Sequence, residues 1–227
     1  MLTWVAIGSL AGALLLTGRW MLSPRDSLGR TISFPMVSVA LLVVAGSGAL
    51  VPVVLHQRLE QRLASVASAE VGAPVTVHCQ TVGQEMVDVG SELGYVRYGP
   101  DGVPEHATLI KHAQCGDLSA YLHSDKAVPS LDQVIAVHVL THEAQHMAGQ
   151  TSEASAECQA VQRDAQTAQL LGATADQARA LAQRYWSEVY PRMGDDYRSP
   201  DCAPGGALDE HLPDAPWSVP VPSGAGA

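Results

Sequence analysis

Charged side chains are absent from two long stretches near the N-terminus. Residues 2–18 and 32–55 contain no Asp, Glu, Lys or Arg. Because about 20 apolar helical residues cross the hydrocarbon core of a bilayer, the second stretch is long enough to span it. The first stretch spans if Arg19 extends its side chain to the interface. No basic residue precedes the first stretch and no clear cleavage site follows it, which disfavours a cleaved signal peptide. We predict a two-helix transmembrane anchor over residues 1–55; a buried hairpin in a soluble protein is the alternative.

Basic residues are also missing from the N-terminal end. The loop between the two apolar stretches, residues 19–31, instead carries three arginines and a single aspartate. Basic residues in short loops favour the cytoplasmic side of the membrane. Arg58 and Arg62, after the second stretch, argue mildly for the opposite orientation. We therefore expect a multi-pass protein of the cell membrane, with both termini and the main domain outside the cytoplasm.

Basic residues are scarce in the remainder of the chain. From Arg58 onward there are 10 basic and 22 acidic residues, a net charge of −12. This balance disfavours nucleic acid and anionic lipid surfaces as partners of the main domain. The lipid bilayer, reached through the two apolar helices, is the membrane partner that the sequence predicts, and no nucleic acid partner is expected.

Cysteine is absent from the first 78 residues, and no C-x-x-C spacing occurs in the chain. The four cysteines are Cys79, Cys115, Cys158 and Cys202. An even number in an oxidising compartment indicates two disulfides, and the missing C-x-x-C disfavours a cysteine zinc site. Three pairings are possible, and the sequence does not choose among them. We favour Cys79–Cys115 with Cys158–Cys202, because each bond would join neighbouring parts of the chain.

Helix and turn signals divide the outer region. Residues 56–74 are expected to form a juxtamembrane helical stalk that Gly72 and Pro74 end. The segment 75–80 alternates like a strand, and segments 94–98 and 106–112 flank a turn, which together predict a small antiparallel sheet.

Three helices are expected to follow the strands. They begin at a capping box at Ser130, at Thr151 or Ser152, and at a second capping box at Thr174. The predicted class is therefore α+β: two transmembrane helices, then a mostly helical domain over residues 75–215. A proline-rich tail, residues 216–227, is expected to be disordered.

The first predicted helix of the main domain contains HEAQH. His142 and His146 lie one helical turn apart, so both imidazoles can reach one ion. Glu143 lies between them, where its carboxylate can meet a water molecule at that ion. His138, although it shares the same stripe, is about 12 Å from His146 along the axis and is expected to be a core residue or a support for a ligand.

The next helix supplies the candidate third ligand. Glu153 falls in its first turn, and Gly149 allows the chain to reverse between the helices. Glu157, one turn further on, can accept a hydrogen bond from a ligand imidazole. Catalytic zinc commonly has three protein ligands and one open position, which matches His142, His146 and Glu153. Glu157 as the third ligand is the alternative.

HEAQH followed by EASAECQA resembles the gluzincin branch of the zincin metallopeptidases over about residues 130–160. Many gluzincins carry E-x-x-A-[D/E]-x-x-A on the second helix. The resemblance implies His142, His146 and Glu153 as Zn²⁺ ligands, Glu143 as the general base and Glu157 as the acid that supports a ligand. The layout of the whole chain is also similar to small membrane-anchored HExxH proteins of actinobacteria, which implies a location but no activity.

The sequence departs from the gluzincin pattern in the short connection between His146 and Glu153. The spacing of Gly149 is similar to the metzincin pattern H-x-x-G-x-x-H, but its third ligand would fall on Ser152, and serine is a poor zinc ligand. No residue stands out as the group that would stabilise the transition state. The candidates are Tyr185, Tyr190, Tyr197 and His211.

The function that these residues predict is zinc-dependent hydrolysis of peptide bonds in a peptide or protein substrate. The alternative is a non-catalytic, disulfide-stabilised binding or envelope-scaffold module whose metal site is structural or degenerate. An open metal position beside a groove would favour catalysis, and a closed one would favour a structural metal.

Overall fold

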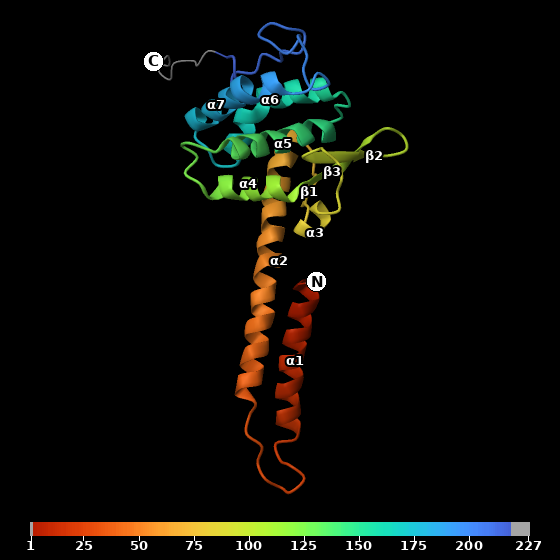
Figure 1. Ribbon diagram of the computed structural model, residues 1–227, viewed down its shortest axis with the longest axis vertical. Coiled ribbons are helices and arrows are strands. Elements are labelled where there is room, and N and C mark those ends of the chain that lie inside the picture. The colour runs from red at the N-terminus through yellow and green to blue at the C-terminus, as the bar shows by residue number, and fades with distance from the viewer. Residues whose placement is uncertain (1, 219–227) are drawn as a thin grey trace. The chain divides into compact units, whose positions relative to one another are not determined.

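The computed structural model describes residues 2–218 and divides the chain into two compact units, Met1–Leu59 and Glu60–Ala227 (Figure 1). The first unit contains α1 (Leu2–Leu22) and most of α2 (Met36–Val71). Both helices are long and apolar enough to cross a membrane, with mean hydropathies of 1.5 and 2.3. Within this unit α1 and α2 pack closely at Gly46, where a Cβ atom would lie 2.8 Å from the side chain of Leu10.

The described part of the second unit contains about the last three turns of α2, three strands and four long helices. Its elements are β1 (Thr76–Cys79), α3 (Val82–Glu85), β2 (Gly94–Tyr98), β3 (Pro104–Ile110), α4 (His112–His123), α5 (Leu131–Met147), α6 (Glu153–Leu170), α7 (Ala175–Arg184), the π-helix η1 (Tyr185–Val189) and the 3₁₀-helix η2 (Tyr190–Arg192). In this unit α5 lies between α4 and α6, with the sheet beside its C-terminal half (Figure 1).

The end of α2 belongs to the core of the second unit. Leu63, Val66 and Ala67 are buried there. Glu60 accepts a hydrogen bond from the backbone N–H of Cys79 (2.9 Å), and Arg62 donates to the carbonyl of Leu170 (2.6 Å). The predicted stalk is therefore helical, and its last turns are a packed element rather than a spacer.

The sheet is mixed, so the prediction of an antiparallel sheet was wrong. The strand order is β1-β3-β2; β3 is antiparallel to β2, as expected for a hairpin, but parallel to β1. The segment 80–93, which contains α3, reverses the chain after β1, and the hairpin turn reverses it again, so β3 enters between the first two strands with the direction of β1. Parallel strands require such a longer connection.

Helix α4 was not predicted. Residues 106–112 were expected to form one strand, but β3 ends at Ile110 and α4 begins after Lys111, with Cys115, Leu118 and Tyr121 on its buried face. The helix has no side-chain cap at its start. The start signal that marked the other helices is therefore missing here.

Both expected disulfides are present. Cys79–Cys115 joins the end of β1 to α4, and Cys158–Cys202 joins α6 to the segment that follows η2. Together they use all four cysteines. The favoured pairing is confirmed.

The segment after the second disulfide packs on α6. Gln162 on α6 donates to the carbonyl of Leu208 (2.9 Å) and accepts from the N–H of Glu210 (2.8 Å). Trp217 contacts Trp186 with a centroid distance of 5.0 Å. The predicted disordered tail, 216–227, falls mostly on residues 219–227, which lie outside the described residues.

Candidate metal centre

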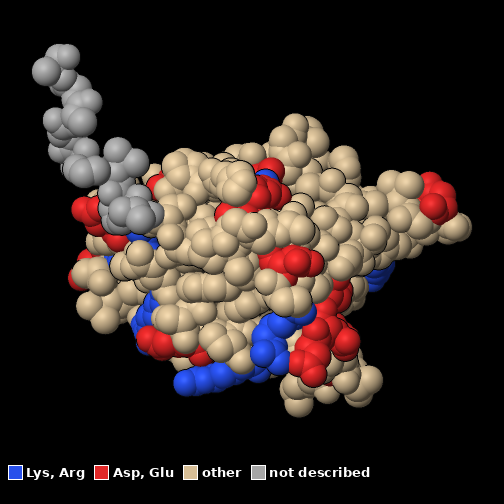
Figure 2. Space-filling view, turned by 90° about the horizontal axis from the view of Figure 1, so that it is seen from above, with Lys and Arg blue, Asp and Glu red and all other residues tan. Residues whose placement is uncertain are grey.

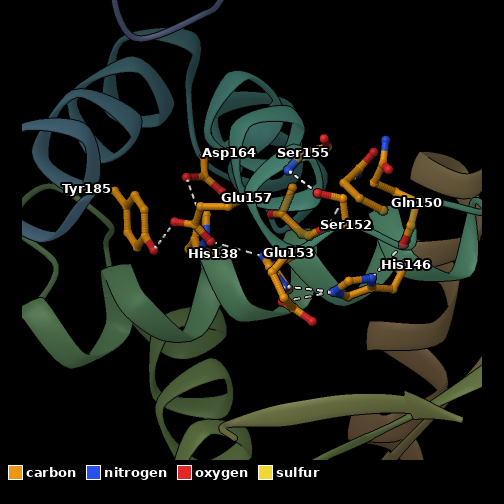
Figure 3. Close-up of polar contacts among 12 residues, drawn as sticks. His138, His146, Gln150, Ser152, Glu153, Ser155, Glu157, Asp164 and Tyr185 are labelled. Carbon is orange, nitrogen blue, oxygen red and sulfur yellow. Dashed lines mark hydrogen bonds and ion pairs between the residues drawn. The ribbon is translucent and has the colours of Figure 1, made fainter. Parts of the chain in front are cut away.

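Two adjacent helices hold the candidate ligands. Helix α5 begins at the predicted capping box of Ser130 and Gln133, and its last 12 residues are all buried. Helix α6 begins at Ser152, whose side chain accepts from the N–H of Ser155, and this places Glu153 in the first turn. Figure 3 shows α6 directing its acidic side chains toward α5.

The reversal between the two helices depends on Gly149. Its φ of +106° is a conformation that only glycine adopts readily. The N–H of Gly149 bonds the carbonyl of His146 (2.9 Å), and the N–H of Gln150 bonds the carbonyl of Gln145 (3.0 Å). This pair of bonds is a Schellman motif. It ends α5 at Met147, with Ala148 as the C-cap and Gly149 as the next residue.

His142, His146 and Glu153 converge on one point, as the sequence predicted. Their facing atoms are Nε2 of His142, Nε2 of His146 and Oε2 of Glu153. The two nitrogens are 3.0 Å apart, and the oxygen lies 3.2 Å from His142 and 3.4 Å from His146. The structure therefore brings together three groups that could hold a metal ion.

The opposite nitrogens of the two imidazoles are already engaged. Nδ1 of His146 lies 2.6 Å from the carbonyl of Gln150, and Nδ1 of His142 lies 3.0 Å from Oε2 of Glu157. Both partners are acceptors, so each Nδ1 carries the proton. When both imidazoles are neutral, each Nε2 therefore faces the centre with a lone pair, beside the oxygen of Glu153. Three lone pairs this close repel one another unless a cation lies among them.

The spacing of the three atoms would accommodate a metal ion of the size of zinc. A tetrahedral zinc ion with ligand distances of about 2.0–2.1 Å separates its ligands by roughly 3.4 Å. The three observed separations, 3.0–3.4 Å, are close to that value. Two neutral imidazoles and one carboxylate, with no fourth ligand in the group from residues 2–218, are also a donor set that catalytic zinc uses.

The hydrogen bonds of the centre shift the pKa values of His142 and Glu153 in opposite directions. Burial would lower the pKa of His142, but hydrogen bonds to Glu153 and Glu157 outweigh it and raise the pKa to about 9. Hydrogen bonds from His142 and His146 lower the pKa of Glu153 to about 2. A metal ion therefore has to displace a proton, as metal binding to imidazoles generally does.

Glu157 lies behind the ligands, not among them. Its carboxylate accepts from Nδ1 of His142 (3.0 Å), from Nε2 of His138 (2.9 Å) and from the hydroxyl of Tyr185 (2.7 Å) (Figure 3). It reaches His142 on the side of the ring away from the three-atom centre. His138, His142 and Glu157 also lie close enough to form a second metal-binding group. The three hydrogen bonds of Glu157 account for that cluster without an ion.

His138 joins two carboxylates in the protein interior. Its Nδ1 bonds Oδ2 of Asp164 at 2.9 Å, while Nε2 bonds Glu157. Burial would lower the pKa of His138, but Asp164 and Glu157 outweigh it and raise the pKa to about 10. The ring stacks on Tyr185 with a centroid distance of 3.6 Å. A charged imidazole therefore fixes Glu157, which in turn fixes His142.

Glu143 lies beside the centre and packs against strand β2 at Gly94. It is 4% exposed, and burial raises the pKa of its carboxyl to about 7 against the lowering effect of His142 and His146. A Cβ atom on Gly94 would lie 3.0 Å from the carboxylate, so a side chain at that position would displace it. The carboxyl can therefore exchange a proton near neutral pH within the site.

A cleft of about 410 Å³ opens onto the centre. Its walls come from β2 and the residues before it, from α5, and from the segment between η1 and Tyr197. His142, Glu143, His146 and Glu153 all line it. The side chain of Glu153 is 45% exposed, so the open side of the centre faces solvent.

The four candidates for stabilising the transition state lie in different surroundings. Tyr197 lines the cleft, with its ring centroid 5.9 Å from that of His142. Tyr185 is committed to Glu157, and Tyr190 bonds the backbone of Ser199. His211 is exposed and pairs with Asp209. Of the four candidates, Tyr197 is therefore the one that lines the cleft near His142 and whose hydroxyl is not hydrogen-bonded to Glu157 or Ser199.

The sequence did not reveal two polar residues near the centre. Tyr98 places its hydroxyl 3.2 Å from Nδ1 of His146 and donates to Gln150. Asp164, two turns after Glu157 on α6, accepts a hydrogen bond from Nδ1 of His138. The spacing of Asp164 from Glu157, seven residues, could have indicated a shared helical face. Tyr98 depends on how the hairpin packs on α5, for which the sequence carries no signal.

No protein-family model, curated protein or solved structure matches this chain.

Proposed function

We propose that this protein is a membrane-anchored, zinc-dependent metallopeptidase that resembles the gluzincins and acts outside the cytoplasmic membrane. One observation carries the proposal: two imidazole Nε2 atoms and a carboxylate oxygen meet within 3.0–3.4 Å of one another at the base of a solvent-accessible cleft. A zinc ion held there would polarise a substrate carbonyl and lower the pKa of a water molecule.

Glu143 is the proposed general base. Its carboxyl is buried beside the two histidines and has a pKa of about 7, close to the pH at which proton transfer in both directions is easiest. We assign it to take a proton from the attacking water and to pass it to the leaving amine. Tyr197, whose ring centroid lies 5.9 Å from that of His142, is the proposed donor to the developing negative charge.

Strand β2 gives the cleft a way to align a peptide. In the described part of the chain β2 pairs only with β3, so its other edge is free for an extended segment. Residues 91–96 line the cleft. A peptide added along this edge would pass over Glu143 and the ligands, and backbone pairing of this kind binds peptides with little dependence on sequence.

The proposed location follows from the apolar helices and the disulfides. Two disulfides in the second unit suit an oxidising compartment, and three arginines in the loop between α1 and α2 suit the cytoplasm. On the face in Figure 2, acidic and basic side chains both lie in small groups among uncharged areas, and no continuous basic surface for nucleic acid is visible there.

The test is zinc content and hydrolysis by the full chain in detergent. We expect about one zinc per chain and cleavage of an unfolded protein such as casein. Glu143→Gln should retain zinc but lose about 10²–10⁴-fold in rate, the range that general-base catalysis contributes. Glu105→Gln, at an exposed position on β3, is the control and should match the wild type. A metal-free wild type, or a Glu143→Gln variant with full activity, would refute the proposal.

A further inference from the structure

An apolar segment of the second unit lies uncovered between β1 and β2. Four of its large side chains are more than half exposed: Val82 (54%), Met86 (82%), Val87 (79%) and Val89 (101%). They belong to α3 and to the turn that follows it. The other exposed large apolar side chains in the described part of this unit are spread between residues 93 and 128. We call residues 82–89 the apolar tip; a cluster of this kind marks a surface that another molecule or a membrane covers.

Strand β1 leads to the apolar tip by running back along the end of α2. The N–H of Val75 donates to the hydroxyl of Ser68 (3.0 Å). Four residues later, the N–H of Cys79 donates to Glu60 (2.9 Å). Four strand residues and eight helical residues each cover about 12–13 Å, so the two segments lie side by side with opposite directions. Figure 1 accordingly shows α3 on the side of the second unit at which its part of α2 begins.

That side of the second unit is close to the predicted bilayer. Leu55 is the last residue of the charge-free stretch 32–55, and Glu60 follows five residues later in the same helix. Five helical residues rise about 7–8 Å, and the headgroup layer on each side of the hydrocarbon is roughly 5–8 Å thick. The chain that continues beyond Cys79, which is level with Glu60, therefore reaches the headgroup layer.

The acidic side chains of the apolar tip bond to the protein, while its apolar side chains point outward. Asp88 accepts from the side chain of Gln80 (2.6 Å) and from the N–H of Gly90 (3.0 Å). Glu85 accepts from the N–H of Ala113 at the start of α4 (3.4 Å). The tip contains no Lys or Arg, so it has no cation to attract anionic headgroups. Its contribution to membrane binding would come from removing apolar side chains from water.

We propose that the apolar tip inserts into the headgroup layer of the membrane in which α2 is anchored, as an attachment in addition to the two apolar helices. This inference rests on the proposed transmembrane anchor and is independent of the metal and of peptide hydrolysis. Ser91, Glu92 and Leu93, which line the cleft, follow Val89 within four residues, at most about 14 Å of chain. The inserted tip therefore holds one wall of the cleft close to the bilayer surface.

The experiment places single fluorophores on the full chain in phosphatidylcholine vesicles. The native cysteines are all paired, so Val89→Cys, Val44→Cys in α2 and Val103→Cys in the hairpin turn can each carry an environment-sensitive maleimide dye. All three positions are more than half exposed. Val103 is the matched control, because β3 runs parallel to β1 and so places the turn before β3 at the end of the sheet away from α3.

Quenching by spin-labelled lipids reports contact with the bilayer and its depth. For Val89→Cys we expect labels near the headgroup to quench at least about twofold more than labels at the chain end, because interfacial segments enter only about 5–10 Å. Val44→Cys, in the middle of the charge-free stretch, should show the reverse order, and Val103→Cys should not be quenched. Adding Val87→Asp should remove the quenching at Val89→Cys, since a carboxylate is costly to move out of water. Val128→Asp, at an exposed position outside the tip, should leave it unchanged.

The outcomes separate this proposal from the anchor on which it rests. If Val44→Cys is quenched and Val89→Cys behaves like Val103→Cys, the helices span the membrane and the insertion of the tip is overturned. If neither is quenched, the anchor fails and the insertion fails with it. Shielding of Val89→Cys that grows with protein density, without quenching by labelled lipid, would assign the surface to a second copy of the chain and also overturn the proposal. Should Val89→Cys not accumulate as a folded protein, Met86→Cys takes its place in every comparison.

Discussion

The imidazole of His142 is held between two glutamates. Nε2 faces Glu153 at 3.2 Å and Nδ1 faces Glu157 at 3.0 Å. One turn of α6 separates the two acids, so they contact opposite edges of one ring. Glu153 is a candidate ligand because it also reaches His146, at 3.4 Å, and Glu157 is a support because it also bonds His138.

This difference predicts unequal effects on zinc affinity. Glu157→Gln keeps the shape of the side chain and removes its charge, and it should weaken zinc binding about 10–100-fold, as is typical for the partner of a ligand. Glu153→Gln removes the proposed direct ligand and should weaken binding more. Competition with a chromophoric chelator at fixed pH measures both dissociation constants. Glu105→Gln is the control for the loss of a surface carboxylate. If Glu157→Gln abolished binding while Glu153→Gln preserved it, the ligand assignment would be reversed.

The sequence located the centre well because helix periodicity is strict. Positions 142 and 146 must share one face of α5, and a glutamate in the first turn after a Gly reversal must point back at it. Asp164 and Tyr98 were missed for different reasons. Asp164 reads as an ordinary helix residue until its buried partner, His138, is known. Tyr98 lies at the site because of how β2 pairs with β3 and packs on α5. The alternation of side chains along a strand does not predict that register.

At the scale of elements, the turn between α5 and α6 determines the site. The Schellman motif at Gly149 closes α5 and also presents the carbonyl of Gln150, which binds Nδ1 of His146 at 2.6 Å. The same reversal starts α6 at Ser152 and so delivers Glu153. The positive φ of Gly149 therefore determines both the tautomer of one candidate ligand, His146, and the position of another, Glu153.

Gly149→Ala should destabilise the protein and weaken zinc binding. Space is not the cause, because nothing lies within 4 Å of the added Cβ; the cost comes from a φ of +106° and is about 1–2 kcal/mol. The urea midpoint, followed by tryptophan fluorescence in detergent, measures the change. Gly116→Ala in α4, where space is also open and φ is not positive, should instead stabilise by about 0.5–1 kcal/mol. Equal effects of the two substitutions would contradict this account.

The errors in the predicted elements also have physical causes. Local signals predicted α5 and α7, where capping boxes stand at Ser130 and Thr174. They predicted the hairpin as well, but the parallel pairing of β1 with β3 joins residues 31 positions apart, such as Thr76 and Ala107, which no local pattern encodes. Helix α4 lacks a capping side chain and follows its strand without a break, so its start was assigned to the strand.

At the scale of the whole molecule, the two disulfides and the two apolar helices make the proposed orientation in the membrane testable. All four cysteines are paired in the second unit, so the wild-type chain offers no free thiol. Disulfides persist outside the cytoplasm and are rare inside it. The arginines of the loop between α1 and α2 argue independently that this loop stays inside. A single added cysteine can therefore report the side of the membrane on which it lies, without background from the native ones.

Ser27→Cys in that loop and Val128→Cys in the second unit are the matched pair, since both positions are exposed. In intact cells a membrane-impermeant maleimide should label Val128→Cys and leave Ser27→Cys unlabelled, and permeabilisation should make the two equal. The wild type should stay unlabelled throughout, because its thiols are paired. Labelling of Ser27→Cys alone in intact cells would place the metal centre in the cytoplasm and overturn the proposed location. Labelling of both in intact cells would mean that α1 and α2 do not span the membrane as a hairpin.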